Sequence, residues 1–254
     1  MKKGILSALI SLCLLVGCKN KISLSKIGAQ RIEINDSIAP NKDIEAFITP
    51  FRNHVDSSLN AAVSYSKTYY SKKDGELNTA IGNMMADAVM KQAGPVFKSR
   101  TGHTLDFVLL NHGGIRSTIP KGAVTKRTAY EVMPFENEVV VVGLPGNQVN
   151  KLLVYLKSSK RAHPVSKELE LILNRDYDIL SARIKGETID PDRIYYVATS
   201  DYLFNGGDRM SFFQPNALFE ELDYKIRNIL IDYFMTVDTL SASIDNRFIR
   251  KTAG

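Results

Sequence analysis

A short apolar run that ends in two adjacent glycines is the feature that most constrains this fold. Residues Phe107 to Leu110 have the composition of a buried strand, and they lead directly into NHGGIR, Asn111 to Arg116. Paired glycines allow positive φ angles and a close approach of the backbone to a bound molecule. Asn111 offers an amide that donates and accepts, and Arg116 a planar cation suited to phosphate or carboxylate. The segment predicts a ligand site at a sheet edge, although a tight turn with a surface arginine would have the same sequence.

A second strand end with the same construction follows later in the chain. The segment 199–208 reads TSDYLFNGGD, so a predicted strand again runs into paired glycines. Tyr202 or Phe204 could stack on a planar base, which stabilises such complexes by roughly 1–3 kcal/mol. Asp208 suits the vicinal hydroxyls of a ribose because an ionised carboxylate only accepts hydrogen bonds. Phe135, in a Pro-Phe-Glu turn, is the candidate for the opposite side of the stack. Single aromatic residues are more often core, but two such strand ends together favour a planar ligand.

The other elements mix helices and strands without a regular alternation. Apolar spacing predicts helices over 44–59, 79–94 and 219–235, a brief one starting at Thr128, and one after Pro145. Strands are expected over 31–34, 61–70, 107–110, 138–144, 168–174, 178–184 and 193–200. The pair Gly94-Pro95 predicts a helix end, and Thr128 to Glu131 has the spacing of a capping box. This order indicates an α+β domain with a mixed sheet packed against helices.

The N-terminus predicts export and lipidation. Lys2 and Lys3 precede an apolar run, 5–16, that is typical of a signal-peptide core and too short for a mature membrane span. The run ends in LVGC, which resembles the bacterial lipoprotein box, with Cys18 as the lipidated residue. A plain secretory signal or an N-terminal anchor is the alternative. The expected organisation is therefore a signal peptide over 1–18, a tether over 19–42 and one domain over 43–254. The protein is expected to be held by lipid on a bacterial membrane, on the periplasmic side or at the cell surface.

Charge and residue inventory exclude several function classes. The formal net charge is +6, and removal of Lys2 and Lys3 with the leader leaves +6 − 2 = +4, with basic residues scattered rather than clustered. Nucleic-acid binding is therefore not expected. The four histidines belong to no metal-binding pattern, and the sequence has no GxSxG motif and no free mature cysteine. We expect no metal site and no catalytic group in this chain, and we interpret His112 as a loop histidine.

Four motifs in this order resemble the C-terminal domain of the bacterial and animal 5′-nucleotidases. They are IGNMMADA (81–88), NHGGIR (111–116), MPF (133–135) and YLFNGGD (202–208), and the similarity extends from Asp43 to Arg247. The resemblance implies that the domain holds the nucleoside part of a substrate between two aromatic rings. It implies the following binding residues: Asn111, Gly113, Gly114, Arg116, Phe135, Tyr202, Asn205, Gly207 and Asp208.

Roles are carried over from the family by position. Phe135 and Tyr202 would be the two rings, and Asn111 would face the base. Arg116 would lie on the ribose or phosphate side, and Asp208 would bind the ribose hydroxyls.

The sequence departs from the family at three points. The family commonly has phenylalanine at the position of Tyr202, and it usually places a phosphate-side arginine at the position of Leu77. Lys72 or Lys73 could supply the missing cation. Family enzymes also carry an N-terminal metallophosphatase domain with two metal ions. Only the expected leader and tether precede the predicted domain here.

Two functions are compatible with these residues. The favoured one is the recognition half of a split 5′-nucleotidase, in which a separate metallophosphatase chain supplies the divalent metals and hydrolysis needs both chains. The alternative is a membrane-tethered nucleoside- or nucleotide-binding lipoprotein without catalysis. A purely structural surface lipoprotein is a third possibility.

Overall fold

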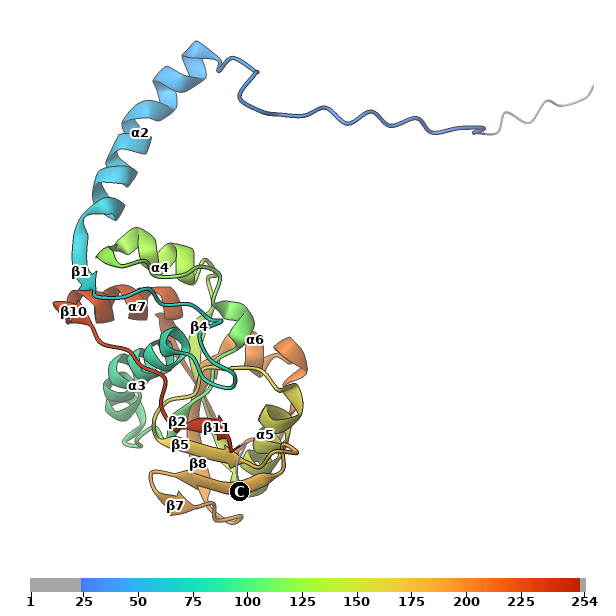
Figure 1. The fold of residues 1–254 in the computed structure, drawn as a ribbon, viewed down its shortest axis with the longest axis vertical. Helices are drawn as coiled ribbons and strands as arrows, with labels where there is room; N and C mark the ends of the chain where they lie inside the picture. The colour runs from blue at the N-terminus through green and yellow to red at the C-terminus, as the bar shows by residue number, and fades with distance from the viewer. Residues whose placement is uncertain (1–23, 252–254) are drawn as a thin grey trace, which may run out of the picture. The chain divides into compact units, whose positions relative to one another are not determined.

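The computed structural model describes residues 24–251, and the expected signal peptide with Cys18 lies outside them. The predicted α+β class is confirmed, with six α-helices and three mixed sheets in the described range. Contact density separates a segment that ends at Ile48 from a compact unit that begins at Thr49 (Figure 1). Within the described range, no helix combines the length and the apolar character that crossing a membrane requires.

The helices are α2 (Lys42–Asn60), α3 (Ala80–Thr101), α4 (Lys126–Val132), α5 (Gly146–Ser159), α6 (Asp201–Phe204) and α7 (Ile226–Met235). Three 3₁₀ turns are η1 (His112–Gly114), η2 (Gly207–Arg209) and η3 (Ser211–Phe213). The strands are β1 (Ala62–Ser66), β2 (Phe107–Val108), β3 (Gly122–Thr125), β4 (Glu138–Pro145), β5 (Leu169–Leu173), β6 (Ile179–Ile184), β7 (Glu187–Thr188), β8 (Ile194–Ser200), β9 (Leu218–Lys225), β10 (Thr239–Leu240) and β11 (Phe248–Arg250).

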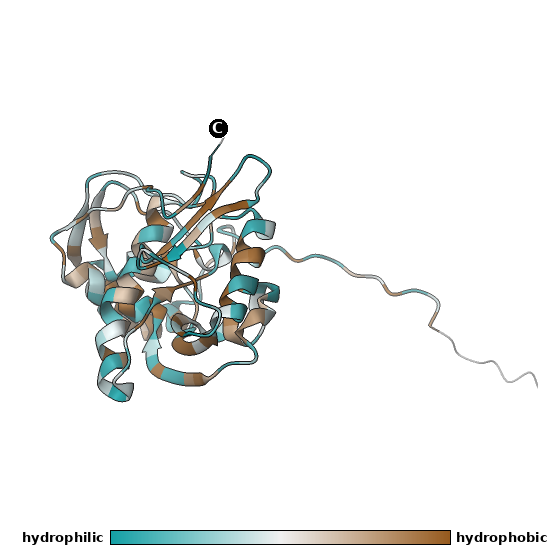
Figure 2. Ribbon diagram, turned by 90° about the horizontal axis from the view of Figure 1, so that it is seen from below, coloured by the Kyte–Doolittle hydropathy of each residue, from teal (hydrophilic) through white to brown (hydrophobic). Residues whose placement is uncertain are grey.

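A four-stranded sheet of order β2-β8-β4-β9 divides the compact unit into two cores. In β4, Val139 and Val141 join the core that contains α3 and α7, while Val140 and Val142 join the core that contains α5. Successive strand side chains point to opposite faces, so four valines in a row require that both faces be covered. Figure 2 shows hydrophobic segments running through the strands and helices, with hydrophilic residues along many outer loops. Smaller sheets of order β11-β5-β6-β7 and β10-β1-β3 complete the unit.

The prediction of one helix over 219–235 was wrong in its first half. Residues Leu218–Lys225 form β9, which pairs antiparallel with β4, and the helix α7 begins only at Ile226. Leu222 and Ile226 are both buried, so their four-residue spacing imitates one face of a helix. Pairing with the buried strand β4 outweighs this local pattern because it gives that strand its second hydrogen-bonded neighbour.

The predicted helix end at Gly94-Pro95 was also wrong. Helix α3 continues to Thr101 and ends at Gly102, which has a left-handed φ of 77°. A proline inside a helix costs about 3 kcal/mol. Complete burial of Ala93 and Phe97 on either side of Pro95 offsets that cost.

Two smaller expectations are corrected. Helix α4 is capped by Thr125 rather than by Thr128: the Thr125 hydroxyl accepts from the Thr128 N–H, and the Thr128 hydroxyl accepts from the Thr125 N–H. The predicted strand over 31–34 is irregular and exposed, because its residues have no neighbouring strand with which to pair in the described range.

Candidate functional site

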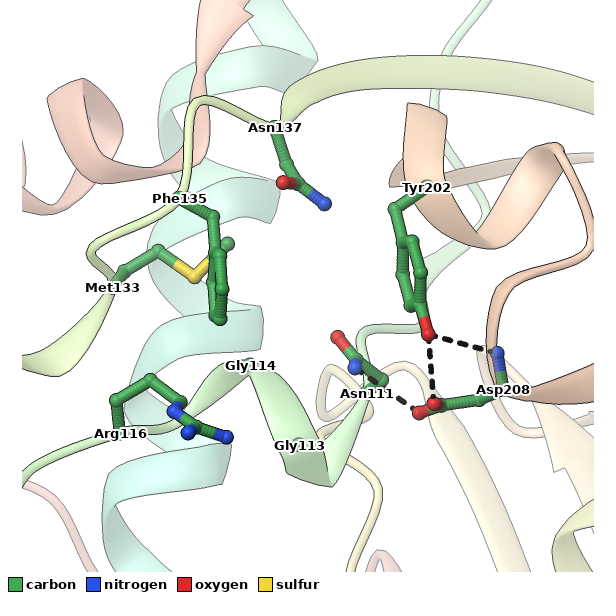
Figure 3. A pocket seen from close by; sticks show the side chains of 9 residues that line it. All are labelled: Asn111, Gly113, Gly114, Arg116, Met133, Phe135, Asn137, Tyr202 and Asp208. Carbon is green, nitrogen blue, oxygen red and sulfur yellow. Dashed lines mark hydrogen bonds between the residues drawn. The ribbon is translucent and has the colours of Figure 1, made fainter. Parts of the chain in front are cut away.

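Three of the four predicted motifs, NHGGIR, MPF and YLFNGGD, meet at one edge of the central sheet. Strands β2 and β8 are parallel, so their carboxyl ends lie at the same edge, and the antiparallel β4 begins there. The three segments attached to these strand ends enclose a pocket of about 320 Å³ (Figure 3). Its lining residues are Asn111, Gly113, Gly114, Arg116, Met133, Phe135, Asn137, Tyr202 and Asp208.

Two aromatic rings stand on opposite sides of this pocket. The rings of Phe135 and Tyr202 face each other across open space (Figure 3), and the two residues are 39% and 44% exposed. Large aromatic side chains usually bury most of their surface. A flat molecule inserted between the two rings would cover both of them.

The Asp208 carboxylate lies below the Tyr202 hydroxyl (Figure 3), and a hydrogen bond restrains each of its two oxygens. Asn111 Nδ2 donates to Asp208 Oδ2 at 3.0 Å, and the Tyr202 hydroxyl donates to Asp208 Oδ1 at 3.1 Å. The Tyr155 hydroxyl donates to the Asp208 carbonyl at 2.8 Å. Asp208 and Arg209 have left-handed φ angles of 50° and 63°, which non-glycine residues adopt only where the surroundings hold them. The structure thus presents a carboxylate in a defined position.

The turn that carries Phe135 is anchored from helix α7. The buried guanidinium of Arg227 donates to Glu136 Oε1 and, at 3.4 Å, to the Phe135 carbonyl. Hydrogen bonds from Lys225 and Arg227 lower the pKa of the Glu136 carboxyl. The sequence contained no signal for this support, since Arg227 lies ninety-one residues from Glu136.

Two histidines support the paired-glycine turn. The His112 N–H donates to Nδ1 of His163 at 3.3 Å, and the His112 ring pairs with the Ala162 carbonyl at 3.2 Å. Burial lowers the pKa of His163 to about 4. His163 is therefore neutral at pH 7, and because its Nδ1 accepts a hydrogen bond, its proton is assigned to Nε2.

We expect His163 to make the fold sensitive to acid. Between pH 6.5 and about 4 the unfolded chain binds a proton that the folded chain does not, so stability falls as the pH falls through this window. At pH 5 this histidine lowers the free energy of unfolding by about 2 kcal/mol relative to pH 7. Urea unfolding at both pH values should show a smaller loss for His163→Gln than for the unmodified chain. The control substitution is His54→Gln, at an exposed position of helix α2. An unchanged pH dependence in His163→Gln would contradict the assignment.

Two cations lie beside the pocket. Arg116 is exposed, with its guanidinium carbon 5.8 Å from the centre of the Phe135 ring. Lys72 Nζ donates to the carbonyl of Ile115, the residue before Arg116, at 2.7 Å. Partial burial, followed by the positive charges of Arg116 and Lys73, lowers the pKa of Lys72. Within residues 24–251 neither Arg116 nor Lys72 forms an ion pair with a carboxylate, so both charges are available to an anion.

Three residues singled out in the sequence lie away from the pocket lining. Asn205 donates to the Asp201 carbonyl at 2.9 Å, and Gly207 packs directly against the Tyr202 ring. Leu77 is 2% exposed and belongs to the core that contains α5. Conversely, Met133 and Asn137 line the pocket although they were not predicted as site residues.

The described residues do not fit a metal ion. Across residues 24–251, no three His, Cys, Asp or Glu side chains come together as a set of ligands. We therefore assign no metal-dependent step to these residues.

Comparison with known proteins places this geometry in context. A family model described as "5′-nucleotidase, C-terminal domain" matches residues 59–215. Protein UshA of Escherichia coli is 25% identical over 202 residues, covering 76% of this chain and 34% of UshA. Cell wall protein Lmo0130 of Listeria monocytogenes is 27% identical over 209 residues, covering 74% of this chain and 26% of that protein. The chain thus spans about a third or less of the length of these curated relatives.

The fold is shared with a solved structure. The crystal structure of a 5′-nucleotidase precursor from Thermus thermophilus superimposes with a TM-score of 0.67 and 20% identity. The match covers 83% of this chain and 43% of the other.

Proposed function

The chain belongs to the family of 5′-nucleotidase C-terminal domains, and we propose that it is the nucleotide-recognition half of an extracytoplasmic 5′-nucleotidase. The observation that carries this proposal is the pocket itself, in which two rings face each other and a carboxylate, held by an amide, lies below the Tyr202 ring. A metallophosphatase on a separate chain would supply the divalent metals and the hydrolytic step. Nucleotide would be converted to nucleoside and phosphate at the interface of the two chains.

Each part of a nucleotide has a counterpart in the pocket. The base would stack between Phe135 and Tyr202, with the Asn111 amide directed toward its edge. The ribose hydroxyls would donate to Asp208, and the phosphate would lie toward Arg116 and Lys72. Arg116 and Lys72 have no carboxylate partner among the described residues, which supports a ligand that carries negative charge.

Phe135→Ala tests the stacking step. We expect the dissociation constant for adenosine to rise about tenfold, because one face of the base loses its aromatic partner. Isothermal titration of the chain with adenosine and with adenosine 5′-monophosphate measures this. Tyr69, 59% exposed and outside the pocket, provides the control substitution Tyr69→Ala, which should bind both ligands normally. If Phe135→Ala binds adenosine as tightly as the unmodified chain does, the stack is not the binding mode.

The split arrangement has its own test. The chain would be mixed with a metallophosphatase chain from the same organism, and phosphate release from adenosine 5′-monophosphate would be followed with and without a divalent metal. We expect release only when both chains and the metal are present, and a reduced rate with Phe135→Ala. A rate no higher than that of the metallophosphatase alone would exclude a catalytic partnership.

We also propose that the protein is exported and held by lipid at Cys18. The apolar leader and the LVGC segment support this, and one relative is described as a cell wall protein. Mass spectrometry of the protein purified from membranes should find an acylated N-terminal cysteine, and Cys18→Ser should release the protein from the membrane fraction.

A second candidate is a lipid-anchored binding protein for nucleosides or nucleotides without catalysis. The position of Leu77 favours it, because a buried leucine cannot contribute to phosphate binding. Equal affinities for adenosine and its monophosphate, together with no phosphate release in the mixture, would support this reading over the first.

A further inference from the structure

We propose that the Tyr202 hydroxyl makes this pocket selective for an intact ribose 2′,3′-diol, because it fixes the Asp208 carboxylate before the ligand arrives. The proposal rests on the proposed nucleotide-binding function and adds a specificity-determining group to it. Tyr202 therefore has two separable parts, a ring that faces the base and a hydroxyl that acts on the sugar site.

One hydroxyl group makes both bonds of this contact. The Tyr202 oxygen donates to Asp208 Oδ1 at 3.1 Å and accepts from the Asp208 N–H at 3.2 Å. Its donor and one of its acceptor positions are thus used on the same residue. The Tyr202 hydroxyl therefore restrains both the backbone and the side chain of Asp208.

The restrained carboxylate keeps room for a diol. Asn111 occupies one position on Oδ2 and Tyr202 one position on Oδ1. A carboxylate has about four acceptor positions, so each oxygen retains one for an incoming hydroxyl. Two neighbouring O–H groups on a ribose can therefore donate to the two oxygens together.

The segment that carries Asp208, residues 206–209, requires such a restraint because most of its backbone is left-handed. Gly206, Asp208 and Arg209 all have left-handed φ angles, of 89°, 50° and 63°. For non-glycine residues this conformation persists only when surrounding contacts hold it. A phenylalanine ring at position 202 could stack on a base, but it would leave Asp208 with fewer restraints. The hydroxyl thus prepares the carboxylate for the sugar, which reduces the ordering cost of binding.

The test is the substitution Tyr202→Phe, with binding of adenosine and of 2′,3′-dideoxyadenosine measured by calorimetry. We expect adenosine affinity to fall about fivefold more than dideoxyadenosine affinity, the scale of one lost hydrogen bond. The preference for the diol should therefore fall about fivefold. Tyr69→Phe is the matched control and should keep the full preference. Asp208→Asn should lower the affinity for adenosine by a larger factor than the affinity for dideoxyadenosine.

The outcomes separate this proposal from the one on which it rests. If the unmodified chain binds adenosine and Tyr202→Phe keeps the same preference for it over the dideoxy ligand, the role of the hydroxyl is wrong and the nucleoside pocket stands. If the unmodified chain binds neither ligand, the proposed function fails, and the inference fails with it. Tyr202 is 44% exposed, so Tyr202→Phe should keep one cooperative urea-unfolding transition, which checks that the variant is folded.

Discussion

Arg247→Met is expected to lower the free energy of unfolding by about 3 kcal/mol. The Arg247 side chain is 6% exposed and donates to both carboxylate oxygens of Asp87, to both of Asp245 and to the Val165 carbonyl. It thereby joins helix α3, the segment that leads into β5 and the segment that leads into β11. Methionine has similar length but no donor, so it would leave the two carboxylates without the arginine's positive charge and the buried Val165 carbonyl without its donor.

The exposure of the partners sets the size of this effect. The side chains of Asp87 and Asp245 are 36% and 39% exposed, so water can hydrate them once the arginine is gone. We therefore expect the lower end of the usual 3–5 kcal/mol range for a broken buried pair. Lys157→Met, which breaks the exposed pair between Lys157 and Asp178, is the control and should cost under about 1 kcal/mol. Urea unfolding measures the free energy of unfolding of both variants. Similar decreases for the two would show that the buried Arg247 contributes no more to stability than an exposed ion pair does.

Gly207→Ala is expected to weaken adenosine binding on the order of 100-fold, close to 3 kcal/mol. A Cβ atom at Gly207 would lie 2.5 Å from two ring atoms of Tyr202 and 2.5 Å from its carbonyl oxygen. Such distances are well inside van der Waals contact, so the ring and the backbone at Tyr202 must both move. Asp208 is the next residue and would move with them. The base stack and the sugar site would thus be lost through a single methyl group.

A glycine elsewhere provides the control for this substitution. A Cβ atom at Gly94, inside helix α3, would meet only Leu105, at 3.9 Å. Gly94→Ala should therefore bind adenosine normally and gain up to about 1 kcal/mol of stability from helix propensity. The segment around Gly207 lies at the surface, so Gly207→Ala should remain folded by circular dichroism. Normal adenosine binding by Gly207→Ala would mean that Tyr202 does not belong to the binding site.

Local patterns in the sequence were sufficient wherever neighbouring residues decide the structure. The run of four valines was identified as the strand that became β4, and the spacing of residues 44–59 as the helix that became α2. The two paired-glycine segments were identified as turns at strand ends, because glycine is suited to backbone conformations that other residues avoid. Strand, helix and turn formation at these positions depends on residues close together in the chain, so the types and spacing of those residues predict it.

Only the tertiary structure decided how distant residues meet. Asn111 and Asp208 are ninety-seven residues apart, and Arg227 and Glu136 ninety-one, so no local pattern connects them. The same is true of β9, where pairing with β4 replaced a helix that the apolar spacing predicted. The sequence by itself thus identified most of the residues that line the pocket, among them Asn111, Phe135 and Asp208. The parallel direction of β2 and β8 determined that they form one pocket, because it brings both strand ends to a single edge of the sheet.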